Sequence, residues 1–111
     1  MADGIAYKVL TPEDLAALAA GAFDGAPIDR AHGYVHLSTA AQLTGTVERH
    51  FSGQTDLTIA AVDLAVLGPA VRWEPSRDGQ LFPHLYGTLV LQAVIATCAL
   101  EFDADGAVRL P

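Results

Sequence analysis

The 111-residue sequence has little of several features that define protein classes. It contains one cysteine, Cys98, so an internal disulfide is impossible. Its longest nearly apolar run, 88–100, falls short of the about 20 residues that a membrane-spanning helix needs. Charged residues make up 17% of the chain, compared with about 25% in typical globular domains. These shortages argue against a disulfide scaffold, a membrane span and a highly charged disordered chain.

Positive charge is the scarcest ingredient of the sequence. Six Lys and Arg residues face 13 Asp and Glu, which gives a net charge of −7 and an isoelectric point near 4.7. An acidic protein repels the phosphate backbone of nucleic acids and the surface of anionic membranes. We therefore expect no nucleic-acid partner and no membrane partner, whereas a local cationic pocket for a small-molecule ligand stays open.

Apolar residues are what the chain has in excess. They form 51% of it, and the mean hydropathy is +0.32. This supply supports the core of one domain over residues 1–111, and a domain of this length can fold as a monomer. The first residues lack the basic and apolar segments of a secretory signal, so we expect a cytoplasmic protein.

Hydrophobic periodicity and capping signals divide the chain into short elements. Helices are predicted over 12–20 and 39–50, and a loop is predicted over 23–30. The predicted β segments are 5–10, 34–38, 57–62, 71–74, 85–91, 93–102 and 108–110, with a helical elbow at 63–68, a polar loop at 76–83 and a turn at 103–106. Helices in the first half and strands in the second indicate an α+β fold with a mostly antiparallel sheet.

Three polar clusters interrupt the apolar pattern, and the first is the segment 34–38. Alternate side chains of a strand share a face, so Tyr34, His36 and Ser38 point one way. Val35 and Leu37 point the other way, toward the expected core. The polar face then offers an imidazole and a phenol for hydrogen bonding or proton exchange near neutral pH. The alternative is a half-exposed strand with ordinary polar residues.

The second and third clusters are the segments 73–79 and 82–87. Glu74 and Arg77 lie at a strand end, where a carboxylate can orient a hydroxyl and a guanidinium can bind an anion. His84 and Tyr86 share one face if their segment is extended. The alternative for the second cluster is a surface turn with an ion pair worth at most about 1 kcal/mol.

Other kinds of site lack their motifs. No spacing matches HExxH, CxxC or a His-rich tract, so no metal is expected. His32 and His36 would pair only on a helix, which Gly33 opposes. Cys98 is expected to be a small buried hydrophobe in an apolar strand that is either central or at a sheet edge. His50 is expected only to interact with a helix dipole.

Taken in order, these motifs resemble a known family. They are Tyr7-Lys8-Val9-Leu10, Asp29 with 33–39, His50-Phe51, 73–79 and 82–87. From Tyr7 to about Val94 the chain resembles the bacterial and plant domain-of-unknown-function family 952. This resemblance implies a fold similar to the ADP-ribosyltransferase superfamily, in which a split, curved sheet grips NAD in a central cleft. The expected architecture is thus α+β, with a curved, mostly antiparallel split sheet and two helices in the N-terminal half.

The resemblance also implies roles for single residues. The strand 34–37 looks like the His-x-His-Leu strand of the RNA 2′-phosphotransferase branch, with Tyr34 in place of the first histidine. Glu74 is the nearest candidate for the late glutamate that holds a nucleotide ribose or activates an acceptor. The expected catalytic residues are His36, Glu74 and His84, and the expected ligand-binding residues are Tyr34, Ser38, Arg77 and Tyr86.

Three functions remain open at this point. The first is an ADP-ribosyltransferase-like enzyme that acts at a glycosidic bond, with NAD or ADP-ribose as substrate or ligand rather than as a resident cofactor. The second is a non-catalytic module that binds a small molecule or a peptide in the same cleft. The third is a structural role, in which His36, Trp73 and His84 only satisfy buried hydrogen bonds.

Overall fold

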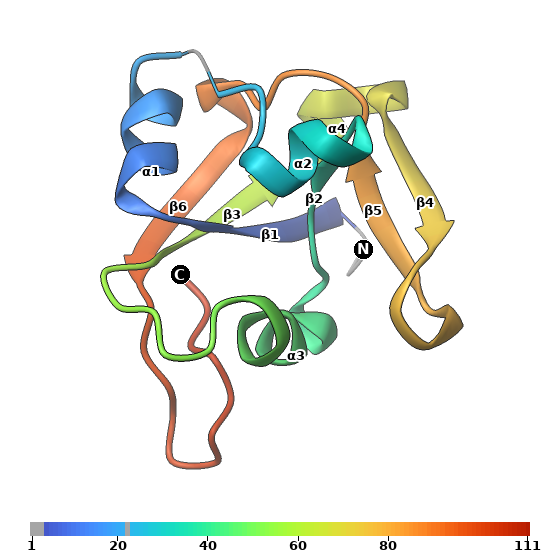
Figure 1. Cartoon of the computed structure of the whole chain (residues 1–111). Helices are drawn as coiled ribbons and strands as arrows, with labels where there is room; N and C mark the ends of the chain where they lie inside the picture. Colours follow the sequence, from blue (N-terminus) through green and yellow to red (C-terminus); the bar gives the residue numbers. More distant parts are fainter. Residues whose placement is uncertain (1–3, 22) are drawn as a thin grey trace.

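The computed structural model describes residues 4–21 and 23–111. Its helices and strands are β1 (Ile5–Leu10), α1 (Pro12–Ala19), α2 (Pro27–His32), β2 (Val35–His36), α3 (Ala40–His50), β3 (Thr58–Asp63), α4 (Leu64–Leu67), β4 (Val71–Pro75), β5 (Leu81–Leu85) and β6 (Val94–Ala99). All strand pairs are antiparallel. The predicted α+β class with antiparallel pairing is therefore confirmed (Figure 1).

The strands form two sheets of three strands each. The first has the order β1-β3-β6 and the second the order β2-β5-β4. One isolated bridge, between Tyr7 and Ser38, connects the described strands of the first sheet to the chain that leaves the second. Its two hydrogen bonds run from Tyr7 N–H to Ser38 O (2.7 Å) and from Ser38 N–H to Tyr7 O (2.9 Å). The meeting line of the two sheets, here called the seam, positions the candidate site.

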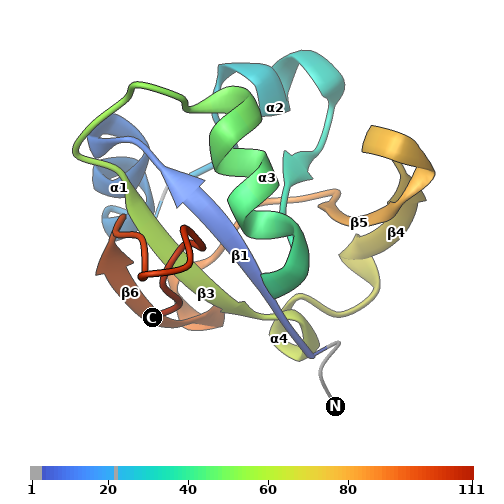
Figure 2. The same cartoon turned by 90° about the horizontal axis from the view of Figure 1, so that it is seen from below.

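Alternation along β1 and β3 divides the core into two layers. One face packs against α3 through residues such as Val9, Leu43, Val47 and Ile59. The opposite face packs against α1 and the second sheet; its buried members are Ala6, Leu10, Leu18, Phe23, Val35, Leu37, Ala60, Val62, Leu64, Leu85, Leu89 and Ala93. Figure 2 shows α3 lying across β1 with β2 beside it. The first sheet is thus covered on both faces.

Capping explains the two helices that the sequence predicts. Thr11 accepts a hydrogen bond from the Asp14 backbone and Pro12 occupies the first helical turn of α1. Thr39 and Gln42 form the equivalent reciprocal box at the start of α3. Helix α4 matches the predicted elbow at 63–68.

The predicted loop over 23–30 is wrong in its second half, which begins α2. The expectation of two helices in the N-terminal half is corrected with it, because α1, α2 and α3 all lie there. Pro27 opens α2, the Asp29 carboxylate accepts the Ala26 N–H, and Gly33 ends the helix with a φ of 88°. These are ordinary start and stop signals, but they enclose only six residues, too few for a visible periodicity.

The predicted polar loop over 76–83 is also too long. A tight turn ends at Gln80, and β5 begins at Leu81 and includes Pro83. Leu37 N–H donates to Pro83 O (3.1 Å), and the reciprocal bond is missing because proline has no N–H. The missing donor lies just beyond the end of β2, which spans Val35–His36 instead of the predicted 34–38.

The predicted strand over 85–91 is wrong, because β5 already ends at Leu85 and 86–90 form no strand. The last two predicted segments are shorter than expected: β6 spans Val94–Ala99, and 108–110 contributes only a bridge from Val108 to Phe102 around the predicted turn. Strand β6 lies at the edge of its sheet, and Cys98 is half-buried there instead of fully buried. No helix within the described ranges is long and apolar enough to cross a membrane.

Candidate functional site

A cavity of about 190 Å³ lies at the seam. Segments far apart in the sequence line it: β1, α2, β2, α3, the β4–β5 turn and β5. The lining residues are Tyr7, Lys8, Val9, Ile28, Asp29, His32, His36, Leu37, Ser38, Thr46, His50, Phe51, Ser76, Arg77, Phe82 and His84.

The lining is rich in nitrogen-bearing side chains. All four histidines of the sequence line the cavity, together with Lys8 and Arg77. Asp29 is the one carboxylate among the lining residues. The buried ion pair with Asp29 compensates the charge of Lys8, so Arg77 is the uncompensated Lys or Arg of the described lining. Such a charge attracts anions into a cleft where low-dielectric walls focus the field.

Asp29 is the buried centre of this site. Its Oδ2 accepts hydrogen bonds from the Lys8 ammonium (2.8 Å) and the Ala26 N–H (2.8 Å). Its Oδ1 accepts from the His36 backbone N–H (3.0 Å) and lies 2.5 Å from His36 Nδ1. Burial raises the pKa of Asp29, but the hydrogen bonds of His36 and the charge and hydrogen bond of Lys8 together bring it well below the usual value. The carboxylate is therefore ionised and fully occupied as an acceptor.

His32 continues this chain of contacts toward the surface. Its Nδ1 lies 2.9 Å from His36 Nε2, and the two rings meet edge to face. The expectation that His32 and His36 pair only on a helix is therefore wrong. His32 ends α2, Gly33 turns the chain through a left-handed conformation, and β2 returns His36 to the same place.

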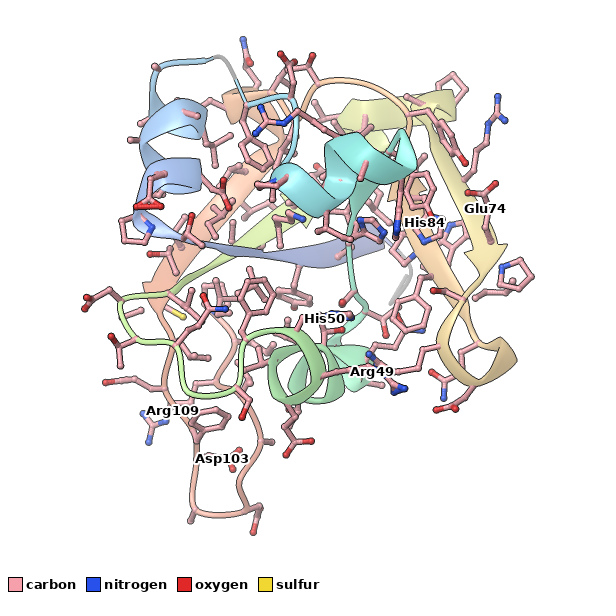
Figure 3. All side chains as sticks on the ribbon, in the orientation of Figure 1. Arg49, His50, Glu74, His84, Asp103 and Arg109 are labelled. Atoms are coloured by element: carbon pink, nitrogen blue, oxygen red, sulfur yellow. The ribbon has the colours of Figure 1, made fainter. Side chains whose placement is uncertain are left out.

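A second carboxylate–imidazole pair lies on β4 and β5. Glu74 Oε1 lies 2.8 Å from His84 Nδ1 and accepts a hydrogen bond from the Tyr86 hydroxyl (2.7 Å). The Tyr86 bond, followed by the His84 bond, lowers the pKa of Glu74, and the same Glu74 bond raises the pKa of Tyr86. Tyr34 stacks on His84 with a centroid distance of 4.0 Å. Figure 3 shows His84 and Glu74 together at the β4–β5 side.

Helix α3 supplies a polar stripe to the cavity. Thr46 and His50 line it one turn apart, and Gln42 precedes them by another turn. Thr46 Oγ1 lies 2.8 Å from Ser38 Oγ. Burial, followed by the neighbouring charge of Arg77, lowers the pKa of His50. His50 therefore faces the site, which corrects the expectation of a dipole contact alone.

Arg77 reaches the cavity over Gly45, a residue of α3 that has no side chain. A Cβ placed on Gly45 would lie 3.1 Å from Arg77 Nη2, so the glycine leaves room for the guanidinium. The guanidinium also lies 5.0 Å from the centre of the Phe82 ring and donates a long hydrogen bond (3.5 Å) to Gln42 O. Within the described ranges, Arg77 has no carboxylate partner. Its positive charge is free for an anion.

The predicted site residues fall into two adjoining groups. Those that line the cavity are His36, Ser38, Arg77 and His84. Those that form an aromatic and acidic group beside it, in contact through His84, are Tyr34, Glu74 and Tyr86. Val35 and Leu37 are buried, as the alternation predicts. Among the described residues, no group of three or more metal-binding side chains gathers.

Several lining residues were absent from the predicted site, although three had a local signal. Lys8 interrupts an apolar strand, and a lysine in that place needs a buried partner. His50 and Thr46 follow the period of α3, one position before the apolar Val47 and Phe51. Asp29 had no local signal of its role, because its partner Lys8 lies 21 residues away.

Comparison with known proteins assigns the chain to a family. Residues 9–97 match the family described as "Protein of unknown function (DUF952)", and the chain belongs to this family. The crystal structure of protein CC0527 from Caulobacter crescentus is similar, with 39% identity, a TM-score of 0.84, and coverage of 95% of this chain and 93% of that one. The solution structure of CC0527 gives 40% identity, a TM-score of 0.78, and coverage of 96% and 91%. No functionally curated protein matches the chain significantly.

Proposed function

We propose that the cavity binds an anionic, nucleotide-like small molecule of the kind represented by NAD and ADP-ribose. One observation carries this proposal: Arg77, which has no carboxylate partner among the described residues, lines a cavity together with four histidines in a chain of net charge −7. Charge placed against the net balance of a protein is the arrangement expected for recognition of a charged ligand. Arg77 holds a phosphate in this proposal, since guanidinium groups bind phosphate oxygens in pairs.

The size of the cavity sets which part of the ligand enters. Pockets for drug-sized ligands measure about 300–1,000 Å³, and this cavity measures about 190 Å³. A phosphate with its ribose fits such a volume, whereas a whole dinucleotide extends beyond it. The extending part lies along the group formed by Tyr34 and Tyr86, whose rings are 5.3 Å apart between centroids. Tyr86 then stacks on a ring of the ligand, and His36 and Ser38 contact the ribose.

The proposal extends to an ADP-ribosyltransferase-like fold and reaction. Two antiparallel sheets that meet at a cavity support this fold, together with the resemblance of the sequence motifs. In the enzymatic form, Glu74 or His84 stabilises the positive charge that develops on the ribose as nicotinamide leaves. In the non-catalytic form, the same contacts hold the ligand without bond cleavage.

Titration with NAD and with ADP-ribose, followed by calorimetry and by NMR shifts of the histidine rings, tests the binding. We expect shifts at His36 and His50, and an affinity that falls about tenfold or more in Arg77→Gln, because a charged hydrogen bond is lost. Arg109→Gln is the matched control, since Figure 3 places Arg109 well away from His84. Absence of shifts at millimolar ligand overturns the proposal.

Released nicotinamide distinguishes the two forms. The protein is incubated with NAD, and nicotinamide is detected by chromatography. Accumulation of nicotinamide, at a rate that Glu74→Gln reduces, supports the enzymatic form. Ligand-induced shifts without any nicotinamide support the binding module instead.

A further inference from the structure

We propose that Asp29, His36 and His32 form a proton relay whose outer end, His32 Nε2, is a general base facing the cavity. The inference deepens the proposed function and rests on it for its substrate, because the base would act on a hydroxyl or water beside a ligand in that cavity. The relay itself follows from the hydrogen bonds of three residues, taken in order from the buried end.

The first step is the role of Asp29, which can only accept. Its two oxygens receive the Lys8 ammonium and two backbone N–H groups, from Ala26 and His36. Its side chain has no exposed surface. An ionised carboxylate has no proton to donate. The remaining contact, at 2.5 Å from His36 Nδ1, therefore requires the proton to be on that nitrogen.

The second step fixes the tautomers of the two imidazoles. A neutral imidazole with its proton on Nδ1 carries a lone pair on Nε2. When both rings are neutral, His36 Nε2 is thus an acceptor, and the group 2.9 Å away, His32 Nδ1, is the donor. His32 is then also protonated on Nδ1, and its own Nε2 carries the free lone pair. Histidine in water prefers the opposite tautomer, so the relay imposes an uncommon state on an exposed side chain.

The third step is the position of the His32 side chain. His32 lines the cavity together with Arg77, the group proposed to hold a phosphate. Gly33, with a φ of 88°, holds His32 at the end of α2 over His36 on β2. The base therefore belongs to the same space as the ligand and receives its orientation from a fully buried carboxylate.

The chemistry available to this relay is activation of water or a hydroxyl. His32 Nε2 takes the O–H proton while the oxygen forms a bond to the electrophilic carbon of the ligand. The bond from that carbon to the leaving group breaks, and its electron pair departs with the leaving group. The positive charge gained by His32 is stabilised through His36 by the Asp29 carboxylate. Asp29 and His36 are positioning residues in this step, and water is the co-reactant in hydrolysis.

Nitrogen-15 NMR of the histidine rings tests the relay without any ligand. At about pH 8.5, where imidazoles in water are neutral, we expect both His32 and His36 to show a protonated Nδ1 and a bare Nε2. In His36→Ala we expect His32 to return to the common tautomer with the proton on Nε2. His50→Ala and His84→Ala are the matched controls, and both should leave His32 unchanged. The four rings are assigned by these substitutions.

Two results overturn the relay: a proton on Nε2 of His32 in the unmodified protein, or a His32 tautomer that does not respond to His36→Ala. The measurement on the unmodified protein decides the question even if a variant folds poorly. Because the NMR measurement contains no ligand, a negative result for the tautomers does not contradict ligand binding, which the titration tests. Conversely, if NAD and ADP-ribose do not bind, the measured tautomers are unaffected.

Discussion

The side chain of Asp29 is completely buried and yet ionised, and Lys8, only 6% exposed, is its ionic partner. Removing one member of a buried ion pair leaves the other charge without compensation, which costs about 3–5 kcal/mol. We therefore expect Asp29→Ala to lower the free energy of unfolding by about that amount in urea titrations.

The exposed acid Glu101 provides the control for this change. Glu101→Ala should alter the free energy of unfolding by less than about 0.5 kcal/mol. A similar small effect for Asp29→Ala would show that the Lys8 ammonium finds water or another partner, and it would contradict the central place of Asp29 in the site.

The lowered pKa of Asp29 gives stability a defined dependence on pH. The unfolded chain protonates this carboxyl near about pH 4, whereas the folded protein keeps it ionised to much lower pH. Its contribution is therefore complete above about pH 4 and is lost as the pH falls below that value. Urea midpoints measured between about pH 7 and pH 3 should fall at the acid end. The fall should be smaller in Asp29→Asn, and an equal fall in both proteins would contradict the assignment.

The positions of single side chains could be predicted where the geometry of a strand determines which way they point. Strand alternation places Val35 and Leu37 in the core and His36 at the cavity. The role of Asp29 could not be found this way, because it depends on a fold that brings residues 8, 29 and 36 together. Carboxylates are common in acidic sequences, so nothing local distinguishes this one from its neighbours.

At the scale of elements, α3 contributes residues both to the core and to the cavity lining. Its residue Gly45 lies against the Arg77 guanidinium. A glycine within a helix is less stable than alanine by about 1 kcal/mol. Gly45→Ala should therefore raise the free energy of unfolding by up to about 1 kcal/mol. The new methyl group would displace the guanidinium of Arg77, which it meets at 3.1 Å, and weaken ADP-ribose binding several-fold.

The prediction for Gly45→Ala is thus a higher free energy of unfolding together with a lower affinity for ADP-ribose. Thermal unfolding and calorimetric titration of the same variant measure the two quantities. Gly53, with a φ of 79°, is a useful contrast, because alanine there should destabilise the protein through backbone strain. Unchanged ADP-ribose affinity in Gly45→Ala would show that Arg77 does not contact the ligand.

Elements with strong local signals were predicted correctly, whereas α2 and β5 were not. Capping boxes mark α1 and α3, and a continuous apolar run marks β3. Helix α2 has fewer than two turns, and β5 contains a proline in the central strand of its sheet. In both cases tertiary contacts stabilise an element that its own sequence specifies weakly.

At the scale of the whole molecule, β6 forms a sheet edge with exposed apolar residues such as Ile95. Open edges can pair with another chain, and β6 itself carries no charged side chain. The net charge of −7, however, makes two copies of the protein repel each other. We predict a monomer in sedimentation experiments over a wide range of protein concentrations. A mass that doubles with concentration, and that reverts in Ile95→Lys, would contradict this prediction.

The single bridge between Tyr7 and Ser38 has a consequence for the motions of the protein. Among the described strands, these two amides alone carry the backbone hydrogen bonds that join one sheet to the other. Their exchange with deuterium therefore reports the opening of the seam and not the unfolding of either sheet. A ligand that spans the cavity would slow the exchange at Tyr7 and Ser38 more than at any amide inside β3. The exchange rates of these two amide protons would then measure how far the two sheets close on a bound ligand.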